Sequence, residues 1–404
     1  MTRPKRTRTS LTHLGRKMTM TEKQFLLLLQ SFVQAVPPKP DEDWNAPALC
    51  RMAAKQNLLP VLAYENKQWK LFARSDVCQS LDGIFYGTVA ANLNRCVAFE
   101  TLSKALSAHG IAHMPVKGYY LRRLYPVPEL RTFGDIDLLI HPADRKAAHE
   151  LMLSLGYTVK QDWEPSYSYF KDAEYYEIHT NLMDGNLDGR ADLQAYFDGA
   201  WAHAVADEGL RYRPADDFHL IYTICHLAKH LYGGGAGMRM YLDVALYVKH
   251  EDSGFNWQGI IEEFSSLGLT TFFHTVMNAC RVWFGVETRC PLPEPDHEAL
   301  EQLLSYTLDS DLFGHFRDHS VMELRKEKEA GRVVRTMLFP PADEIESRYT
   351  FLENRHWLLP LAWSVRLFSN LSLIPNRLRQ MKQVTRTDKT SVERYDGFMR
   401  RIGL

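Results

Sequence analysis

Two aspartates stand inside an apolar run near the middle of the N-terminal half of the chain. Residues 131–140 read Arg-Thr-Phe-Gly-Asp-Ile-Asp-Leu-Leu-Ile, which places Asp135 and Asp137 two positions apart. In a β-strand this spacing points both carboxylates to one face, while Ile136 and Leu138 are buried on the other. Two carboxylates this close raise each other's pKa, so the arrangement is favourable chiefly with a cation between them. Carboxylates and substrate phosphates are the usual ligands of Mg²⁺, so the segment predicts a magnesium-dependent phosphoryl- or nucleotidyl-transfer site.

The segment before this strand predicts a phosphate-binding turn. An isolated Asp-x-Asp pair also fits an edge strand with two solvated acids, so the flanking sequence has to decide between the two interpretations. An apolar stretch, residues 111–116, leads into Lys117 and Gly118, and a helix-like segment over residues 119–125 then ends at Pro126. A strand, a glycine turn and a helix N-terminus together allow backbone N–H groups to approach a phosphate. The flanking sequence therefore favours the phosphate site.

A second acid-bearing strand is predicted downstream. Residues 175–182 read Tyr-Tyr-Glu-Ile-His-Thr-Asn-Leu, and strand alternation places Glu177 and His179 on one face. Glu177 is thus a candidate third acid, with His179 as its neighbour. A helix predicted over residues 142–155 separates the two acidic strands. This alternation of helix and strand over residues 96–182 is typical of an α/β core.

These segments together resemble the uncharacterised nucleotidyltransferase family of the DNA polymerase β-like superfamily. The motifs that carry the resemblance follow one another along the chain: Lys-Gly at 117–118, a helix, Tyr-Pro at 125–126, Arg131, Gly-Asp-Ile-Asp-Leu-Leu-Ile at 134–140, a helix ending in Gly-Tyr, and Glu-Ile-His at 177–179. The resemblance covers most of the chain. It implies an α+β fold in which a small mixed-sheet core is flanked by N-terminal and C-terminal helical parts.

The resemblance also implies a chemistry and assigns residues to it. It implies two Mg²⁺ ions and the transfer of a nucleoside monophosphate from an NTP to an acceptor, with release of pyrophosphate. Asp135 and Asp137 match the paired metal ligands. Glu177 is the best match for the third ligand, and it is also placed to accept the proton of the acceptor's hydroxyl group. The superfamily usually has Gly-Ser at the phosphate turn, whereas this chain has Lys117 and Gly118, so Lys117 becomes the candidate triphosphate contact.

Two arginines are further candidates for neutralising triphosphate charge, Arg131 and Arg239. After a glycine run at residues 233–235, Arg239 and Asp243 lie four positions apart, a spacing that favours an ion pair within one helix. Such a pair either braces the helix or, as the resemblance implies for this segment, lets Asp243 orient Arg239 toward the nucleotide. The glycine run is not a P-loop, because no Gly-Lys-Ser/Thr follows it.

A strong helix is predicted over residues 216–232, and it carries a polar stripe. His226 and His230 have the spacing of a zinc pair, but a zinc protease would need Glu where this chain has Leu227. We expect instead that His226, Lys229 and His230 face the cleft opposite the acids and meet phosphate or acceptor. The alternative is a packed helix whose histidines are satisfied inside the protein.

Composition limits the class of protein. The net charge of -1 argues against a protein whose main task is to coat nucleic acid. The six cysteines show neither a Cys-x-x-Cys pair nor the spacing of a zinc site, which predicts reduced thiols and a cytoplasmic protein. No stretch approaches the roughly 20 apolar residues that span a bilayer, so we expect a soluble chain.

Four regions are expected along the chain. They are a flexible basic tail over residues 1–20, an N-terminal helical region over 21–95, the nucleotidyltransferase core over 96–210 and a C-terminal helical domain over 211–404. The tail has an alternative interpretation as an organelle-targeting or RNA-contacting arm, because it is basic and free of acids.

The C-terminal region contains an apolar segment with arginines. Residues 357–374 are rich in Leu, Trp and Phe, and basic residues follow at Arg377, Arg379 and Lys382. A helix of this composition most commonly packs on the body of a protein. The alternative is peripheral contact with a membrane surface.

Three functions are compatible with these features. The favoured one is a Mg²⁺-dependent nucleotidyltransferase that uses an NTP. The alternatives are a catalytically inactive nucleotide-binding scaffold and a metal-dependent phosphohydrolase with water as acceptor. The set of three acids favours catalysis over a scaffold. A fold does not specify its acceptor, which is a hydroxyl of a small molecule, a sugar, an RNA or a protein.

Overall fold

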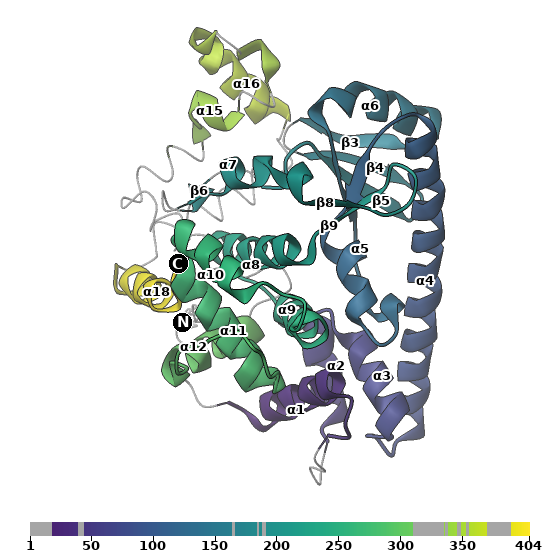
Figure 1. Ribbon diagram of the computed structural model, residues 1–404, viewed down its shortest axis with the longest axis vertical. Coiled ribbons are helices and arrows are strands. Elements are labelled where there is room, and N and C mark those ends of the chain that lie inside the picture. Colours follow the sequence, from purple (N-terminus) through teal and green to yellow (C-terminus); the bar gives the residue numbers. More distant parts are fainter. Residues whose placement is uncertain are drawn as a thin grey trace, which may run out of the picture.

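The computed structural model describes residues 18–38, 44–163, 166–183, 186–187, 191–309, 335, 338–345, 349–352, 355–369 and 389–404. Most of the predicted basic tail lies outside the described residues, as do Arg377, Arg379 and Lys382. The fold is α+β, as predicted, with a five-stranded mixed sheet next to a large helical body (Figure 1). In the described part of the chain, no helix is long and apolar enough to cross a bilayer.

The sheet brings two separate chain segments together. Its strands are β1 (His113–Pro115), β2 (Ile136–Ile140), β3 (Thr158–Trp163), β4 (Ser166–Lys171) and β5 (Glu174–His179). Their spatial order is β1-β2-β5-β4-β3. β1 pairs with β2, and β3, β4 and β5 pair in series, all antiparallel, whereas β2 and β5 run parallel. The strand that carries the paired aspartates therefore lies directly beside the strand that carries Glu177, as the resemblance implied.

Helices α4 (Ser75–Ala108) and α6 (Arg145–Ser154) provide the apolar core on one face of the sheet. This core contains Phe99, Leu102, Leu106, Ile136, Leu138, Ile140, Leu151, Met152, Tyr176 and Ile178. Because side chains alternate along a strand, burying Leu138 and Ile178 here turns Asp137 and Glu177 to the opposite face. That face looks toward the helical body, which leaves the acids between the two parts of the molecule.

The helical body has one continuous apolar core made of N-terminal and C-terminal helices. Its helices are α1 (Met20–Gln34), α2 (Ala46–Lys55), α3 (Leu59–Trp69), α8 (Asp216–Gly233), α9 (Met238–Glu251), α10 (Trp257–Ser266), α11 (Thr270–Phe284), α12 (His297–Asp309) and α18 (Lys389–Ile402). Gln34 on α1 donates to the carbonyl oxygens of Phe284 and Gly285, each at 2.9 Å. The predicted N-terminal and C-terminal helical parts thus share one core.

Shorter elements connect these parts. They are α5 (Lys117–Leu121), η2 (Arg122–Leu124), η3 (Pro128–Leu130), η4 (Pro142–Asp144), β6 (Asn186–Leu187), β7 (Ala191–Asp192), α7 (Leu193–Asp198), η5 (Ala200–His203), β8 (Ala204–Ala206), β9 (Tyr212–Pro214), α15 (Ala342–Ile345), η6 (Thr350–Leu352), η7 (His356–Leu358) and α16 (Leu359–Ser369). The expected boundary between residues 95 and 96 falls inside α4, which continues through it. The expected boundary at 210 falls between the paired strands β8 and β9.

A buried carboxyl group joins α1 to α3. Glu65 is only 1% exposed, and its Oε2 lies 2.5 Å from the hydroxyl oxygen of Ser31. The single hydroxyl proton of Ser31 has a second acceptor, the carbonyl of Val36 at 2.6 Å. If Ser31 donates to Val36, Glu65 must itself be protonated in order to donate to Ser31. Burial accordingly raises the pKa of Glu65 to about 7.

We expect the Glu65→Gln substitution to stabilise the protein at alkaline pH. The folded-state pKa of Glu65 lies above that of the unfolded chain, so the carboxyl group costs nothing below about pH 4.5 and progressively destabilises the fold as the pH rises toward 7. At pH 8 the amide should raise the free energy of unfolding by about 2 to 3 kcal/mol, and at pH 4 by almost nothing. Urea unfolding at both pH values measures this. Glu150→Gln on the exposed side of α6 is the control, and an equal gain at both pH values would contradict the argument.

Candidate active site

A cleft of about 750 Å³ separates the acidic face of the sheet from α8 and α9. It is lined from the sheet side by α5 and the start of β2, and from the body side by one face of α8 and the first turns of α9. All eleven predicted site residues line it, namely Lys117, Gly118, Arg131, Asp135, Asp137, Glu177, His226, Lys229, His230, Arg239 and Asp243. Residues spread over more than a hundred positions of sequence thus meet around one cavity.

Three side chains on the sheet face form a group able to hold a metal ion. The ligand atoms of Asp137, Glu177 and His179 all lie within 4.8 Å of one another, the one such group among the residues that the structure describes. The parallel register places Asp137 directly opposite Glu177. His179 Nε2 lies 2.8 Å from Asp137 Oδ1 and 3.8 Å from Glu177 Oε2. The cluster therefore combines two carboxylates with an imidazole.

Asp135 lies beside this group rather than in it. It precedes the first residue of β2, is half-buried and lines the same cleft. Burial and the negative charge of Asp137 raise the pKa of Asp135 above its ordinary value. The sequence predicted Asp135, Asp137 and Glu177 as the three ligands, whereas the compact group has His179 in the place of Asp135. Strand alternation had put His179 on this face, but spacing alone gave no reason to choose it.

Lys117 supplies a positive charge to the acidic group. Its Nζ lies 2.6 Å from Asp137 Oδ1. Burial alone would raise the pKa of Asp137, but the ammonium of Lys117 and the imidazole of His179 hold it below its usual range. The site therefore keeps Asp137 ionised and already holds one positive charge next to it, the ammonium of Lys117.

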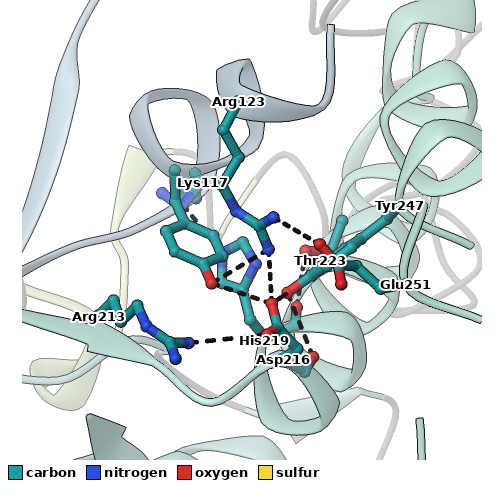
Figure 2. Close-up of polar contacts among 9 residues, drawn as sticks. Lys117, Arg123, Arg213, Asp216, His219, Thr223, Tyr247 and Glu251 are labelled. Atoms are coloured by element: carbon teal, nitrogen blue, oxygen red, sulfur yellow. Dashed lines mark hydrogen bonds and ion pairs between the residues drawn. The ribbon is translucent and has the colours of Figure 1, made fainter. Parts of the chain in front are cut away.

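The backbone of Lys117 is held in a strained conformation. Its φ of +50° lies in the left-handed region, which costs a residue with a side chain about 1 kcal/mol or more. The N–H of Lys117 donates to Nε2 of His219 on α8 at 3.2 Å (Figure 2). Burial lowers the pKa of His219 to about 3, so the ring is neutral and Nε2 is free to accept. This hydrogen bond to His219 holds the backbone of Lys117 in the conformation that points its side chain toward Asp137.

A polar network around Asp216 fastens the same turn to the helical body (Figure 2). Oδ1 of Asp216, in the first turn of α8, accepts from the hydroxyls of Tyr120 and Tyr247, each at 2.9 Å, and from Arg123 at 2.6 Å. Arg123 also pairs with Glu251 at the end of α9, at 2.6 Å. The elements α5, η2, α8 and α9 are thus tied together directly behind the cleft.

A buried ion pair forms the wall of the cleft next to α9. Both oxygens of Asp243 accept from Arg131, from Nη2 at 2.7 Å and from Nε at 3.2 Å. Tyr125 donates its hydroxyl to the same carboxylate at 2.8 Å. The predicted intrahelical pair between Arg239 and Asp243 is therefore wrong, because Arg131 takes the carboxylate and Arg239 donates to the carbonyl of Thr132 at 2.7 Å.

Arg239 keeps unused donor capacity toward the cleft. Its Nε is buried and has no hydrogen-bond partner. Burial and the positive charge of Arg131 lower the pKa of Arg239 to about 10, so the guanidinium remains charged at neutral pH. Gly118 makes room for this arginine-rich wall, since a Cβ at that position would come within 2.5 Å of Nη1 of Arg131. An alanine would have to displace the arginine.

The histidines of α8 lie on the body side of the cleft, as expected. The rings of His226 and His230 contact each other edge to face, with centroids 4.5 Å apart. Burial and the charge of Lys117 lower the pKa of both, in His230 to about 4. Both rings are therefore neutral at pH 7 and can accept a hydrogen bond. Lys229 lines the same wall.

Several cleft residues were not predicted. The cleft is also lined by Asn57, Leu121, Phe133, Gly134, Lys160, Tyr175, Thr223, Gly233 and Met240. Lys160 on β3 lies over the ring of Tyr175 on β5, with its Nζ 4.7 Å from the centroid. Asn57, Leu121, Lys160 and Met240 belong to none of the motifs and come from four separate parts of the chain, namely the turn after α2, α5, β3 and α9, so only the folded chain reveals that they share the cleft.

Comparisons with known proteins agree with this geometry. A family model described as "Uncharacterised nucleotidyltransferase" matches residues 40–285, more than half of the chain. The matched region contains every residue that lines the cleft. No curated protein and no solved structure gives a significant match.

Proposed function

Because the chain belongs to the uncharacterised nucleotidyltransferase family, we propose that it transfers a nucleoside monophosphate from an NTP to a hydroxyl-bearing acceptor and releases pyrophosphate. One observation carries the proposal: Asp137, Glu177 and His179 gather their ligand atoms within 4.8 Å, and the two carboxylates line a cleft whose opposite wall carries Lys229 and Arg239. Acids that hold a cation and cations that receive phosphate are the two components of nucleotidyl transfer.

The acidic group fits a divalent cation. Mg²⁺ takes oxygen ligands, commonly one or two carboxylates together with substrate phosphates and water, and Asp137 with Glu177 provides the carboxylates. The ammonium of Lys117 at 2.6 Å from Asp137 demonstrates a local preference for positive charge. Asp135 would add a further carboxylate for the two Mg²⁺ ions that the family resemblance implies. When bound, Mg²⁺ supplies a Lewis acid that polarises the phosphoryl oxygens.

The basic wall receives the triphosphate. Arg239 lines the cleft and contributes its positive charge, and Lys117 can exchange its contact with Asp137 for one with a phosphate oxygen. Arg131 is held by Asp243 in a fixed orientation, so it presents charge without reorganisation. Electrostatic contacts in a partly dry cleft are worth more than in water, which suits stabilisation of the charge that develops on the leaving pyrophosphate.

Glu177 is placed to take the proton of the acceptor's hydroxyl group. Burial and the charges of Asp137 and Asp135 raise the pKa of Glu177 above its ordinary value, which makes its carboxylate a stronger base. The neutral rings of His226 and His230 face the same cavity and can orient the acceptor through hydrogen bonds.

Labelled nucleotides test the proposal. The protein is incubated with Mg²⁺, each of the four α-labelled NTPs in turn, and a fractionated cell extract as the source of acceptor. Label joined to an acceptor together with released pyrophosphate supports nucleotidyl transfer. Release of labelled nucleotide to water instead identifies a phosphohydrolase, and retained nucleotide binding without turnover identifies a scaffold. Either of these last two results overturns the proposal.

Lys117→Met should strengthen metal binding while weakening catalysis. The substitution removes the ammonium that competes with a metal ion for Asp137, so we expect affinity for Mn²⁺, measured by electron paramagnetic resonance, to rise on the order of tenfold. Turnover of NTP should fall, since the triphosphate loses a positive charge. Lys160→Met is the matched control, because Lys160 lines the cleft over Tyr175 rather than against Asp137. Weaker Mn²⁺ binding by Lys117→Met would contradict this role.

A further inference from the structure

A small unit near the C-terminus has its own apolar core. Ile345, Tyr349, Leu352 and Ala362 are buried together, separately from the two larger cores. Figure 1 draws its helices α15 and α16 at the upper end of the molecule, away from α10, α11 and α12. The inner side of α16 covers this small core through Leu359, Ala362 and Trp363. One side of α16 is thus accounted for by packing.

The opposite side of α16 is also apolar, and it is exposed. Trp357 lies in η7, directly before α16, and is followed by Leu361 and Val365, which are four positions apart on one face of α16. They are 77%, 53% and 40% exposed. Phe339, which packs edge to face on Trp363, is 43% exposed at the margin of the unit. Large exposed apolar side chains that gather in one place indicate an interaction surface.

The charge of the surrounding sequence is one-sided. Between Glu353 and Asp388 there is no acidic residue, whereas the same interval contains Arg355, Arg366, Arg377, Arg379, Lys382 and Arg386. Arg355, in the described part, immediately precedes η7 and is exposed. This contrasts with the whole chain, whose net charge is only -1. The apolar face therefore lies within a locally cationic stretch, which complements a negatively charged partner.

We propose that Trp357, Leu361 and Val365 form a docking face for an anionic phospholipid surface. A tryptophan and aliphatic side chains enter the boundary between headgroups and acyl chains, and the exposed Arg355, two residues before Trp357, contacts lipid phosphates. No helix of the described residues is long and apolar enough to cross a bilayer, so the proposal places this face in the plane of the interface. This attachment is independent of the proposed nucleotidyl transfer, because none of the three residues lines the cleft.

Vesicle sedimentation of the full chain, without nucleotide, tests the proposal. We expect the protein to sediment with vesicles of phosphatidylcholine containing one-third phosphatidylglycerol, to sediment less with phosphatidylcholine alone, and to be released by high salt. Trp357→Ala and Leu361→Ser should each lower the partition coefficient about tenfold, because each removes a large buried apolar contact with the lipid. Both positions are exposed in the free protein, so urea unfolding of the variants should match that of the parent chain.

A matched control and three contrary outcomes make the test decisive. Val97→Ser changes an exposed apolar residue of α4, 60% exposed, and should sediment like the parent chain. The proposal fails if the parent chain ignores the anionic vesicles, or if Leu361→Ser binds them as well as the parent does. It also fails if the chain is a dimer without lipid and Leu361→Ser makes it monomeric, because a second copy would then be the occupant of this face.

Discussion

Asp137→Asn should lower the rate of nucleotidyl transfer about a thousandfold. Oδ1 of Asp137 contacts both Nε2 of His179, at 2.8 Å, and Nζ of Lys117, at 2.6 Å. The amide has the shape of the carboxylate but no charge, so cation binding at the site is lost along with the stabilisation of the charged transition state. Transfer of label from NTP at saturating Mg²⁺ measures the loss, and electron paramagnetic resonance of Mn²⁺ reports binding without catalysis.

The control for this substitution lies on the same sheet. Asp172, at the turn between β4 and β5, has a φ of +52°, a conformation that asparagine also tolerates. Asp172→Asn should therefore leave both transfer and Mn²⁺ binding unchanged. If Asp137→Asn keeps normal Mn²⁺ affinity, the acidic group is not the cation site. If it loses Mn²⁺ but transfers label at the parent rate, the metal is not needed for the reaction.

Asp243→Ala should destabilise the protein by about 3 to 5 kcal/mol, the usual cost of leaving one member of a buried ion pair uncompensated. The side chains of Arg131 and Asp243 are 8% and 3% exposed, so water cannot replace the lost carboxylate. Tyr125 loses its acceptor at the same time. Urea unfolding followed by circular dichroism measures the change in the free energy of unfolding.

A double variant distinguishes two causes of lost stability, the unpaired charge of Arg131 and the missing side-chain volume at position 243. Replacing both partners, as Arg131→Met with Asp243→Leu, removes the unpaired charge and fills the space, so it should recover much of the stability that Asp243→Ala loses. Glu150→Ala, whose pair with Lys146 is largely exposed, should change stability by less than about 0.5 kcal/mol. A double variant as unstable as the single one would indicate that shape, rather than charge, makes Asp243 important.

Local pattern sufficed for the parts of the site that lie on regular elements. Alternation in β2 placed Asp137 opposite Leu138, and the four-residue spacing in α8 placed His226 and His230 on one face, where the structure has them lining the cleft. The helix of α8, predicted over residues 216–232, spans Asp216–Gly233. These predictions succeeded because the period of an element fixes the direction of its side chains whatever the tertiary fold.

The parts that depend on tertiary packing could not be predicted this way. Arg239 and Asp243 satisfied the helical pairing rule, yet a residue 112 positions away took the carboxylate. Arg131 takes the carboxylate because its planar guanidinium meets both oxygens of Asp243, whereas Arg239 donates to the carbonyl of Thr132. The preference for His179 over Asp135 in the compact group likewise depends on how β5 lies beside β2, and no spacing along the chain encodes that.

The parallel contact between β2 and β5 cannot form locally. A parallel pair needs a long crossover, and here α6 and the β3–β4 hairpin intervene before β5 returns to β2. The hairpins β3–β4 and β4–β5 close short loops. Pairing β2 with β5 closes a much longer loop, and this costs more conformational entropy of the chain. Asp137 and Glu177 therefore come together only when the sheet is nearly complete. A chain whose β2 and β5 are not yet paired lacks this group, so we expect a metal ion to bind after the sheet has assembled rather than to nucleate it.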